Sequence, residues 1–357
     1  MKELWSRRIK ELEAYIPGEQ PKDRRYIKLN TNENPCPPSP KALEAIKNAA
    51  SASLRLYPDP DCGELVDAIC EKYGVGRDEV FVGNGSDEVL SMCFPAFFDP
   101  DRSIIFPNIT YSFYPVYAEL YEIPYRTAAL RDDFTVPVEP FLEPNGGVII
   151  ANPNAPTGIA LPLGQIERIA AANSGSVVII DEAYVDFGCE SALPLIHKYP
   201  NLLVVRTTSK SFSLAGLRVG WAMGNANLIA ALNTVKNSIN SYTLDRLAIA
   251  GAAAAIRDGE YFKRCCERVM ATRESSIREL EALGFTCLPS STNFIFARPE
   301  KMAAAELFRE LRARGILVRY FNKPVIDAFL RISVGTDEEM SALTAEIKRL
   351  FAERQIL

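Results

Sequence analysis

VVIIDEAY, residues 177–184, is the stretch that decides the fold of this chain. Four apolar residues come first, and two carboxylates, Asp181 and Glu182, follow them directly. A short, continuously apolar run is typical of a strand that is buried on both faces of a largely parallel sheet. Because such a sheet needs helices on both faces, the stretch predicts an α/β fold built in three layers.

Further apolar runs of this kind alternate with helical patterns on either side of the stretch. They lie at Val80–Val82, Ser103–Phe106, Val148–Ile150, Leu202–Val205 and Val219–Met223. Strands that alternate with helices indicate a mostly parallel sheet with helices on both sides. We therefore expect a large domain over residues 41–245.

The last third of the chain has a different pattern. Two helices and two strands are predicted there, at 260–283, 301–314, 291–297 and 329–335. Thr336 and Glu339 have the spacing of a capping box and precede a final amphipathic helix. The polar, proline-rich residues 1–40 predict one helix and then an extended arm. We therefore expect a smaller α+β domain, formed by residues 246–357 together with this arm.

The composition argues against several classes of function. The formal net charge is −5 at pH 7, whereas a nucleic-acid partner favours a basic surface, so we expect no nucleic acid. No apolar run reaches the roughly 18 residues of a membrane span, and the N-terminus lacks a signal-peptide core. We therefore expect no membrane partner and a cytoplasmic location. The eight cysteines form no C-x-x-C pair and the single histidine, His197, lies away from every motif, so we expect no metal site.

Polar, glycine-rich or charged residues follow several of the predicted strands. These segments are GNGSDE (83–88), ANPNAPTG (151–158), DEAY (181–184) and TTSKSFS (207–213). Ligands of open α/β sheets bind beyond the carboxyl ends of the strands, so a site is predicted where these segments meet. GNGSDE matches neither the dinucleotide-binding nor the P-loop pattern, which leaves an anion-binding helix start or an ordinary turn.

Lys210 is either a cation in a solvated loop or a catalytic amine. Pyridoxal phosphate requires a lysine, an acid for its ring nitrogen, donors for its phosphate and a face for its ring. Lys210 would supply the amine, and Asp181 would supply the acid unless it is a helix cap or a structural ion pair. The expected phosphate contacts are Gly85, Ser86, Asp87, Ser209 and Arg218. The expected ring contacts are Tyr111 by stacking, and Asn152 and Tyr184 at the ring hydroxyl.

Motifs along the whole chain, from about residue 12 to the C-terminus, occur in an order that is specific to one family. They include GNGSDE, ANPNAPTG, IIDEAYVDF, SKSFSLAGLRVGWA and LRISVG. In these motifs the chain resembles the fold-type I pyridoxal-phosphate aminotransferases. The segments YIPGE, IKLNTNENP, YPDPD and GILVRYF narrow the resemblance to the histidinol-phosphate aminotransferase family. Cys36 and Pro37 depart from that family, in which an aromatic residue and a glycine commonly follow NENP.

The resemblance implies the cofactor contacts given above, and it implies further roles that spacing alone does not indicate. Tyr57 of YPDPD would reach the cofactor phosphate of the other subunit, which predicts a homodimer. Outside this family Tyr57 would be interpreted as a packed loop residue. Arg331 and Arg319 would bind the anion of the substrate, and Tyr15 and Asn32 would contact the substrate from the arm.

The implied activity is the transamination of L-histidinol phosphate with 2-oxoglutarate, which gives imidazole acetol phosphate and glutamate in histidine biosynthesis. An aromatic amino-acid aminotransferase and a threonine-phosphate decarboxylase are alternatives within the same fold. A non-catalytic α/β binding module is the alternative from a different class, and it would be colourless when purified.

Overall fold

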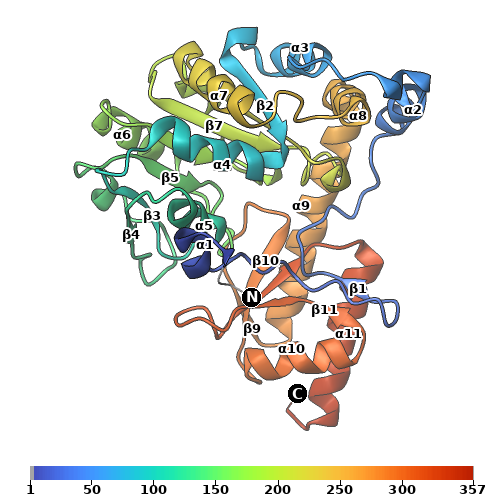
Figure 1. Cartoon of the computed structure of the whole chain (residues 1–357). Coiled ribbons are helices and arrows are strands. Elements are labelled where there is room, and N and C mark those ends of the chain that lie inside the picture. The colour runs from blue at the N-terminus through green and yellow to red at the C-terminus, as the bar shows by residue number, and fades with distance from the viewer. Residues whose placement is uncertain (1–3, 357) are drawn as a thin grey trace.

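A seven-stranded sheet lies at the centre of the fold in a computed structural model, which describes residues 4–356 (Figure 1). The strand order is β2-β8-β7-β6-β5-β3-β4. The strands are β2 (Val80–Asn84), β3 (Ile104–Pro107), β4 (Tyr125–Ala128), β5 (Val148–Ala151), β6 (Val178–Asp181), β7 (Leu202–Thr207) and β8 (Val219–Gly224). In this sheet β8 is antiparallel to its neighbours β2 and β7, and the other pairs are parallel. The predicted mostly parallel sheet is confirmed.

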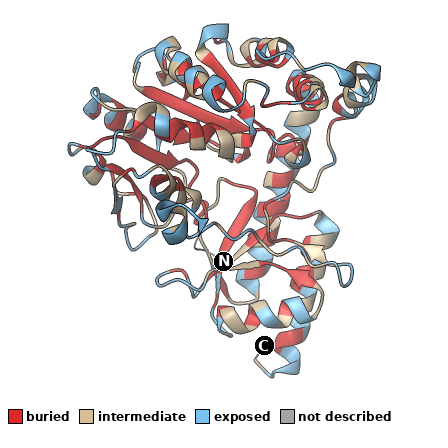
Figure 2. Ribbon diagram, in the orientation of Figure 1, coloured by how far each residue is buried: buried red, intermediate tan, exposed pale blue. Residues whose placement is uncertain are grey.

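Helices cover both faces of this sheet, which we call the large sheet. They are α2 (Pro40–Ala49), α3 (Gly63–Tyr73), α4 (Gly85–Phe97), α5 (Phe113–Leu120), α6 (Leu163–Ala172), α7 (Ala226–Ile239) and α8 (Arg246–Arg257). Successive strand residues point to opposite faces, so Ile180 packs with α3, α6 and α8, whereas Ile179 packs with α4, α5 and α7. The strands are buried between the two helical layers (Figure 2), which confirms the three-layer prediction.

A second, smaller sheet forms below the large one in Figure 1. Its strand order is β12-β13-β10-β9 and all its pairs are antiparallel. The strands of this sheet, which we call the small sheet, are β9 (Phe285–Cys287), β10 (Phe294–Pro299), β12 (Arg319–Tyr320) and β13 (Leu330–Ser333). The helices in this part of the chain are α9 (Gly259–Ala282), α10 (Ala304–Ala313) and α11 (Asp337–Glu353). The N-terminal segment contains the short helix α1 (Arg7–Glu11), and its strand β1 (Ile27–Lys28) pairs with β11 (Ile316–Leu317). The arm therefore pairs with a strand from the last third of the chain, in a two-stranded sheet separate from the small sheet.

The boundary at residue 245 stays a prediction, and the packing of α8 favours a different position. Helix α8, which we assigned to the small domain, packs against α2 and α3. Its buried residues Ala248, Ile249, Ala252 and Ile256 belong to the core on one face of the large sheet. Small alanine side chains allow this close packing between helices, and the sequence pattern does not reveal which core they join. We propose instead that the two domains divide near Arg257, before the long helix α9.

His197 is exposed and faces Glu79, with 3.3 Å between Nδ1 and Oε1. Among the helices of residues 4–356, none combines the length and apolar character that a membrane crossing needs.

Replacing Thr336 by alanine should destabilise α11. The Thr336 hydroxyl accepts from the Glu339 N–H at 3.2 Å, and the Glu339 carboxylate accepts from the Thr336 N–H at 2.9 Å, which is a complete capping box. We expect Thr336→Ala to lower the free energy of unfolding by about 1 kcal/mol, measured by urea denaturation followed by circular dichroism. Thr336→Ser, which keeps the hydroxyl, is the matched control, and equal stabilities for the two variants would contradict the prediction.

Candidate active site

The polar segments that follow the strands of the large sheet meet around one cavity. It encloses about 550 Å³ of empty space, part of which is open to solvent. Its lining residues are Ser86, Asp87, Tyr111, Ala151, Ala155, Asp181, Ala183, Tyr184, Thr207, Ser209, Lys210 and Arg218. Most of the expected cofactor contacts are therefore brought together, and Thr207, which was not among them, lines the cavity as well.

Gly85 and Arg218 form the end of the cavity at the start of α4. Gly85 has a φ of +81°, and a Cβ there would lie 2.7 Å from Nη2 of Arg218. Glycine therefore allows the guanidinium to sit over the first turn of the helix. A Cβ on Gly220 of β8 would lie 2.3 Å from the backbone nitrogen of Ser86, so this strand also approaches the turn closely. The free N–H groups of a helix start and an adjacent arginine suit a phosphate group.

Asp87 does not place a free carboxylate in this phosphate site. Its Oδ2 accepts from Nη2 of Arg218 at 2.8 Å, and its Oδ1 accepts from the hydroxyl of Tyr111 at 2.7 Å. The carboxylate therefore orients both the arginine and the aromatic ring. The contribution that Asp87 could make to phosphate binding is its backbone N–H at the helix start.

Asp181 lies at the carboxyl end of β6 and is buried. Its Oδ2 accepts from the hydroxyl of Tyr114 at 2.9 Å, and its Oδ1 accepts from the backbone N–H of Ala183 at 3.1 Å. Burial raises the pKa of Asp181 to about 6, while these two hydrogen bonds oppose the rise. Tyr114 was missed from the sequence. Its signal was its position three residues after Tyr111, which places the two rings near each other, with centroids 5.6 Å apart.

Lys210 follows β7 and is half-buried at the cavity wall. Its Nζ lies 5.6 Å from the centroid of the Tyr184 ring. Its backbone carbonyl accepts from Nδ2 of Asn34, a residue of the arm, at 2.8 Å. Nearby, the Thr207 hydroxyl donates to the Ser209 hydroxyl at 2.9 Å. The amine is therefore held beside an aromatic ring and two hydroxyl groups, with its backbone fixed by the arm.

Asn152, an expected contact of the ring hydroxyl, does not line the cavity. Its side chain is fully buried and bonds to Leu161: Oδ1 accepts from the backbone N–H at 2.7 Å, and Nδ2 donates to the carbonyl at 3.2 Å. The side-chain amide is thus used to hold the loop after β5, and Ala155 borders the cavity instead. The other expected contact, Tyr184, accepts at its hydroxyl from Nδ2 of Asn32 at 3.0 Å, which brings the arm to the same wall.

Arg319 and Arg331 face each other across the small sheet. They are directly opposite partners in the antiparallel pairing of β12 with β13. Like charges in such positions repel, so the pair is stabilised when an anion lies between or above them. Arg331 donates from Nη2 to the carbonyl of Asn30 at 3.1 Å, while its buried Nε has no partner among the described residues. Burial and the neighbouring Arg319 both lower the pKa of Arg331. This geometry fits an anion site.

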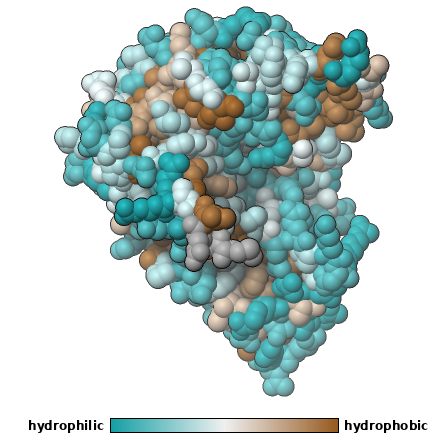
Figure 3. Space-filling model, in the orientation of Figure 1, coloured by the Kyte–Doolittle hydropathy of each residue, from teal (hydrophilic) through white to brown (hydrophobic). Residues whose placement is uncertain are grey.

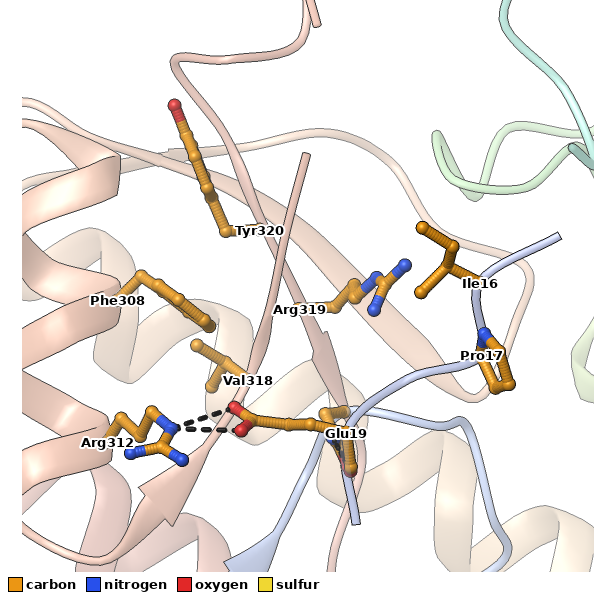
Figure 4. A pocket seen from close by; sticks show the side chains of 9 residues that line it. Ile16, Pro17, Glu19, Phe308, Arg312, Val318, Arg319 and Tyr320 are labelled. Carbon is orange, nitrogen blue, oxygen red and sulfur yellow. Dashed lines mark hydrogen bonds and ion pairs between the residues drawn. The ribbon is translucent and has the colours of Figure 1, made fainter. Parts of the chain in front are cut away.

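Arg319 also reaches a second cavity, which lies under the arm and encloses about 670 Å³ of empty space, part of which is open to solvent. Figure 4 shows Arg319 extending toward Ile16 and Pro17 of the arm. The remaining lining residues are Glu19, Asn30, Phe308, Arg312, Val318 and Tyr320. Glu19 and Arg312 form an ion pair at 2.9 Å across the cavity floor (Figure 4), which ties the arm to α10. None of the residues expected to bind the cofactor lines this cavity.

Tyr15 and Tyr57 lie outside the first cavity in this single chain. Tyr15 stacks on Phe113, with 4.2 Å between ring centroids, so the arm packs on α5. Tyr57 is 76% exposed and stacks on Tyr242, with 4.7 Å between centroids. An exposed aromatic pair of this kind is a feature of surfaces that bind another protein.

The fold and the site are those of an aminotransferase, because residues 24–347 match the family described as aminotransferase class I and II. A histidinol-phosphate aminotransferase from Clostridium acetobutylicum is 55% identical over 352 residues, which cover 99% of this chain and 100% of the relative. One from Marinomonas sp. is 54% identical over 353 residues, with 98% and 100% covered. The chain therefore belongs to the histidinol-phosphate aminotransferase family.

Solved structures agree with this assignment. The histidinol-phosphate aminotransferase from Sinorhizobium meliloti, in complex with pyridoxal-5'-phosphate, superimposes with a TM-score of 0.87 at 25% identity and covers 98% of both chains. A putative histidinol-phosphate aminotransferase from Erwinia carotovora atroseptica superimposes with a TM-score of 0.85 at 25% identity, over 93% of this chain and 97% of that one.

Replacing Tyr114 by phenylalanine should shift the pH at which the cofactor-free protein loses affinity for pyridoxal phosphate. Asp181 is neutral below its pKa of about 6 and anionic above it. A ring-nitrogen cation favours the anion, so affinity should fall as the pH drops through about 6. Tyr114 stabilises the anion, and its loss should move this fall upward by about one pH unit.

The measurement is the dissociation constant of pyridoxal phosphate across this pH range, followed by absorbance. Asp181→Asn is the control, because it removes this titration and leaves that of the cofactor's own phosphate. Identical pH profiles for the wild type and Tyr114→Phe would contradict the role of Tyr114.

Proposed function

We propose that this chain transfers the amino group of L-histidinol phosphate to 2-oxoglutarate, with pyridoxal phosphate as its cofactor. The observation that carries the proposal is the meeting of Lys210, Asp181 and Arg218 in one cavity. Relatives that are more than half identical over nearly the whole chain carry the corresponding name, which supports this substrate.

The residues around the cavity fit pyridoxal phosphate. The α4 start with Gly85, the Arg218 guanidinium and the nearby hydroxyls suit its phosphate. The buried Asp181 suits its ring nitrogen, since a carboxylate in an apolar strand end is stabilised by a cation. Tyr111 offers an aromatic face, and Tyr184 offers a hydroxyl at the opposite wall. When bound, this cofactor supplies an electron sink for the negative charge that develops on the substrate carbon.

Lys210 would have two tasks. Its Nζ would hold the cofactor covalently. In its free, neutral form the same amine would be the base that takes the proton from the substrate carbon that bears nitrogen. Asp181 would meanwhile keep a proton on the ring nitrogen, because its buried anion favours a cation nearby.

Arg319 and Arg331 would bind the anion of each substrate in turn. A phosphate dianion and a carboxylate can both accept two parallel hydrogen bonds from a guanidinium. One site for both anions explains how a phosphate ester and 2-oxoglutarate share one set of catalytic groups. The unpartnered Nε of Arg331 is a donor that such an anion would satisfy.

We also propose that the protein forms a homodimer and acts in the cytoplasm. Exposed apolar side chains gather around Tyr57, and brown atoms lie over and beside α2 in Figure 3. These side chains are Leu54 and Leu56, which precede Tyr57 in the chain, and Tyr242, which stacks on it. A second copy of the chain would bury them and would bring Tyr57 to the cofactor phosphate of its neighbour.

An absorbance titration tests the reaction. The purified protein with bound cofactor is mixed with L-histidinol phosphate without a keto acid, and then with 2-oxoglutarate. We expect the first addition to bleach the cofactor band and the second to restore it. Bleaching by phenylalanine or tyrosine alone would contradict the substrate, and release of CO₂ would favour a decarboxylase. Lys210→Ala should remove turnover, because no other amine lines the cavity among the described residues, and retained turnover would contradict the mechanism.

Arg331→Lys should weaken the binding of both substrates. Lysine keeps the charge but loses the two-pronged donor, so we expect KM for L-histidinol phosphate and for 2-oxoglutarate to rise at least about tenfold. Steady-state kinetics measure both constants. Arg298→Lys, on the exposed side of β10 beside Glu300, is the matched control and should change neither. A rise for one substrate alone would contradict a shared anion site.

A mixed dimer tests whether Tyr57 acts across subunits. Lys210→Ala chains retain Tyr57, and Tyr57→Ala chains retain Lys210, so a mixed dimer has one site with both residues if Tyr57 reaches the partner. Refolding an equal mixture should then give about a quarter of the wild-type specific activity. If Tyr57 serves its own subunit, the mixture has only the mean activity of the two parents.

A further inference from the structure

Behind the cofactor cavity lies a buried ionic cluster that the proposed mechanism does not use. It consists of Arg206 on β7, Glu182 after β6, and Asp186 in the short helix η5 (Val185–Phe187). The side chains of Arg206 and Glu182 are 7% and 0% exposed. Nε of Arg206 donates to Oε2 of Glu182 at 3.0 Å, and its Nη1 donates to Oδ1 of Asp186 at 3.1 Å. Removing charges from water is unfavourable by several kcal/mol, so a cluster of this kind requires close pairing.

The cluster is completed by hydroxyl groups from two different places. The Ser191 hydroxyl accepts from Nη2 of Arg206 at 2.9 Å and donates to Glu182 at 2.8 Å. The Ser211 hydroxyl donates to Oδ2 of Asp186 at 2.6 Å. Asp186 therefore uses one carboxylate oxygen for the cluster and the other for Ser211.

Ser211 is the residue directly after Lys210. Its side chain is fixed by Asp186, and the carbonyl of Lys210 is fixed by Asn34 at 2.8 Å. Both contacts come from other elements of the fold, so they limit how the backbone that carries the lysine can shift. A base that must meet one substrate carbon depends on such limits, since a shift of about 1 Å can lower a rate about a hundredfold.

Asp186 also belongs to the segment that carries Asp181 and Tyr184. Arg206 binds this segment at two points, Glu182 and Asp186, which lie on either side of Tyr184. Asp186 thus links the segment with the ring-nitrogen acid to the residue directly after the lysine, in addition to the pairing of β6 with β7. Among the hydrogen bonds and ion pairs of the described residues, none joins Asp186 to Arg319 or Arg331 of the small sheet.

We propose that Asp186 is a positioning residue, which sets the place of Lys210 relative to Asp181 and Tyr184 through the hydroxyl of Ser211. The inference rests on the proposed function and adds a determinant of its chemical step. Because Arg319 and Arg331 hold the substrate from a different sheet, loss of the contact lowers kcat and leaves substrate binding nearly unchanged.

The test compares Ser211→Ala with Ser191→Ala. Each variant removes one hydroxyl from the same cluster, but only Ser211 connects the cluster to the lysine segment. We expect Ser211→Ala to lower kcat about tenfold, with KM for both substrates within about twofold of the wild type. Ser191→Ala should leave kcat within about twofold. Equal effects of the two variants on kcat would overturn the proposal.

The absorbance of the bound cofactor, titrated with acid and base, gives a second readout that needs no turnover. This absorbance depends on the surroundings of the bond between the cofactor and Lys210. The midpoint of the titration should therefore shift in Ser211→Ala and stay at the wild-type value in Ser191→Ala. If the wild type fails to turn over L-histidinol phosphate, the proposed function falls, while this comparison still tests the positioning role. An unshifted midpoint in Ser211→Ala overturns the positioning role even when turnover is normal.

A double variant separates positioning from general loss of stability. Asp186→Asn and Ser211→Ala remove the same contact, so the double variant should be no slower than the slower of the two single variants. Additive losses would overturn the proposal. If Asp186→Asn does not fold, because it disturbs the pairing of Arg206, the pair of serine variants decides the question alone.

Discussion

The Asp181 carboxylate lies at the end of a strand that is buried on both faces, and much of the site follows from keeping it there. A lone anion in this position is unfavourable, so the protein surrounds it with donors from Tyr114 and the Ala183 backbone. These two donors give fewer hydrogen bonds than a carboxylate can accept, and burial keeps the pKa of Asp181 above its usual value. A cation near Asp181 would stabilise the anion further. The burial of the Asp181 carboxylate, which is unfavourable on its own, would therefore favour a ligand with a positively charged ring nitrogen.

The site draws on both sheets, and the arm connects them. The large sheet supplies the lysine, the acid and the phosphate end, and the small sheet supplies the two arginines. Asn32 reaches Tyr184, and Asn34 reaches the carbonyl of Lys210, so two residues of the arm touch both catalytic segments. The Glu19–Arg312 pair holds the same arm on α10. One stretch of chain therefore contacts the cavity of the large sheet at two points and is fixed on α10 as well.

The sequence predicted the large sheet and most of the cofactor site, because fully apolar runs and the residues after them are local signals. It could not predict contacts that depend on tertiary pairing. The alanine-rich α8 joins the large sheet because of its small side chains, and Asn152 turns away from the cavity to hold Leu161. The direct opposition of Arg319 and Arg331 rests on the register of a strand only two residues long. Tyr57 is still a prediction, since its role lies in a second copy of the chain.

The reversed direction of β8 has a consequence for motion. β8 starts at the edge of the sheet where its parallel neighbours end. The short connection from β7 to β8 therefore carries both Lys210, which follows β7, and Arg218, which precedes β8. The covalent attachment and the phosphate clamp of the cofactor would thus belong to a single loop between two paired strands. A shift of that loop would therefore move Lys210 and Arg218 together, and the paired strands β7 and β8 limit such a shift at both ends of the loop.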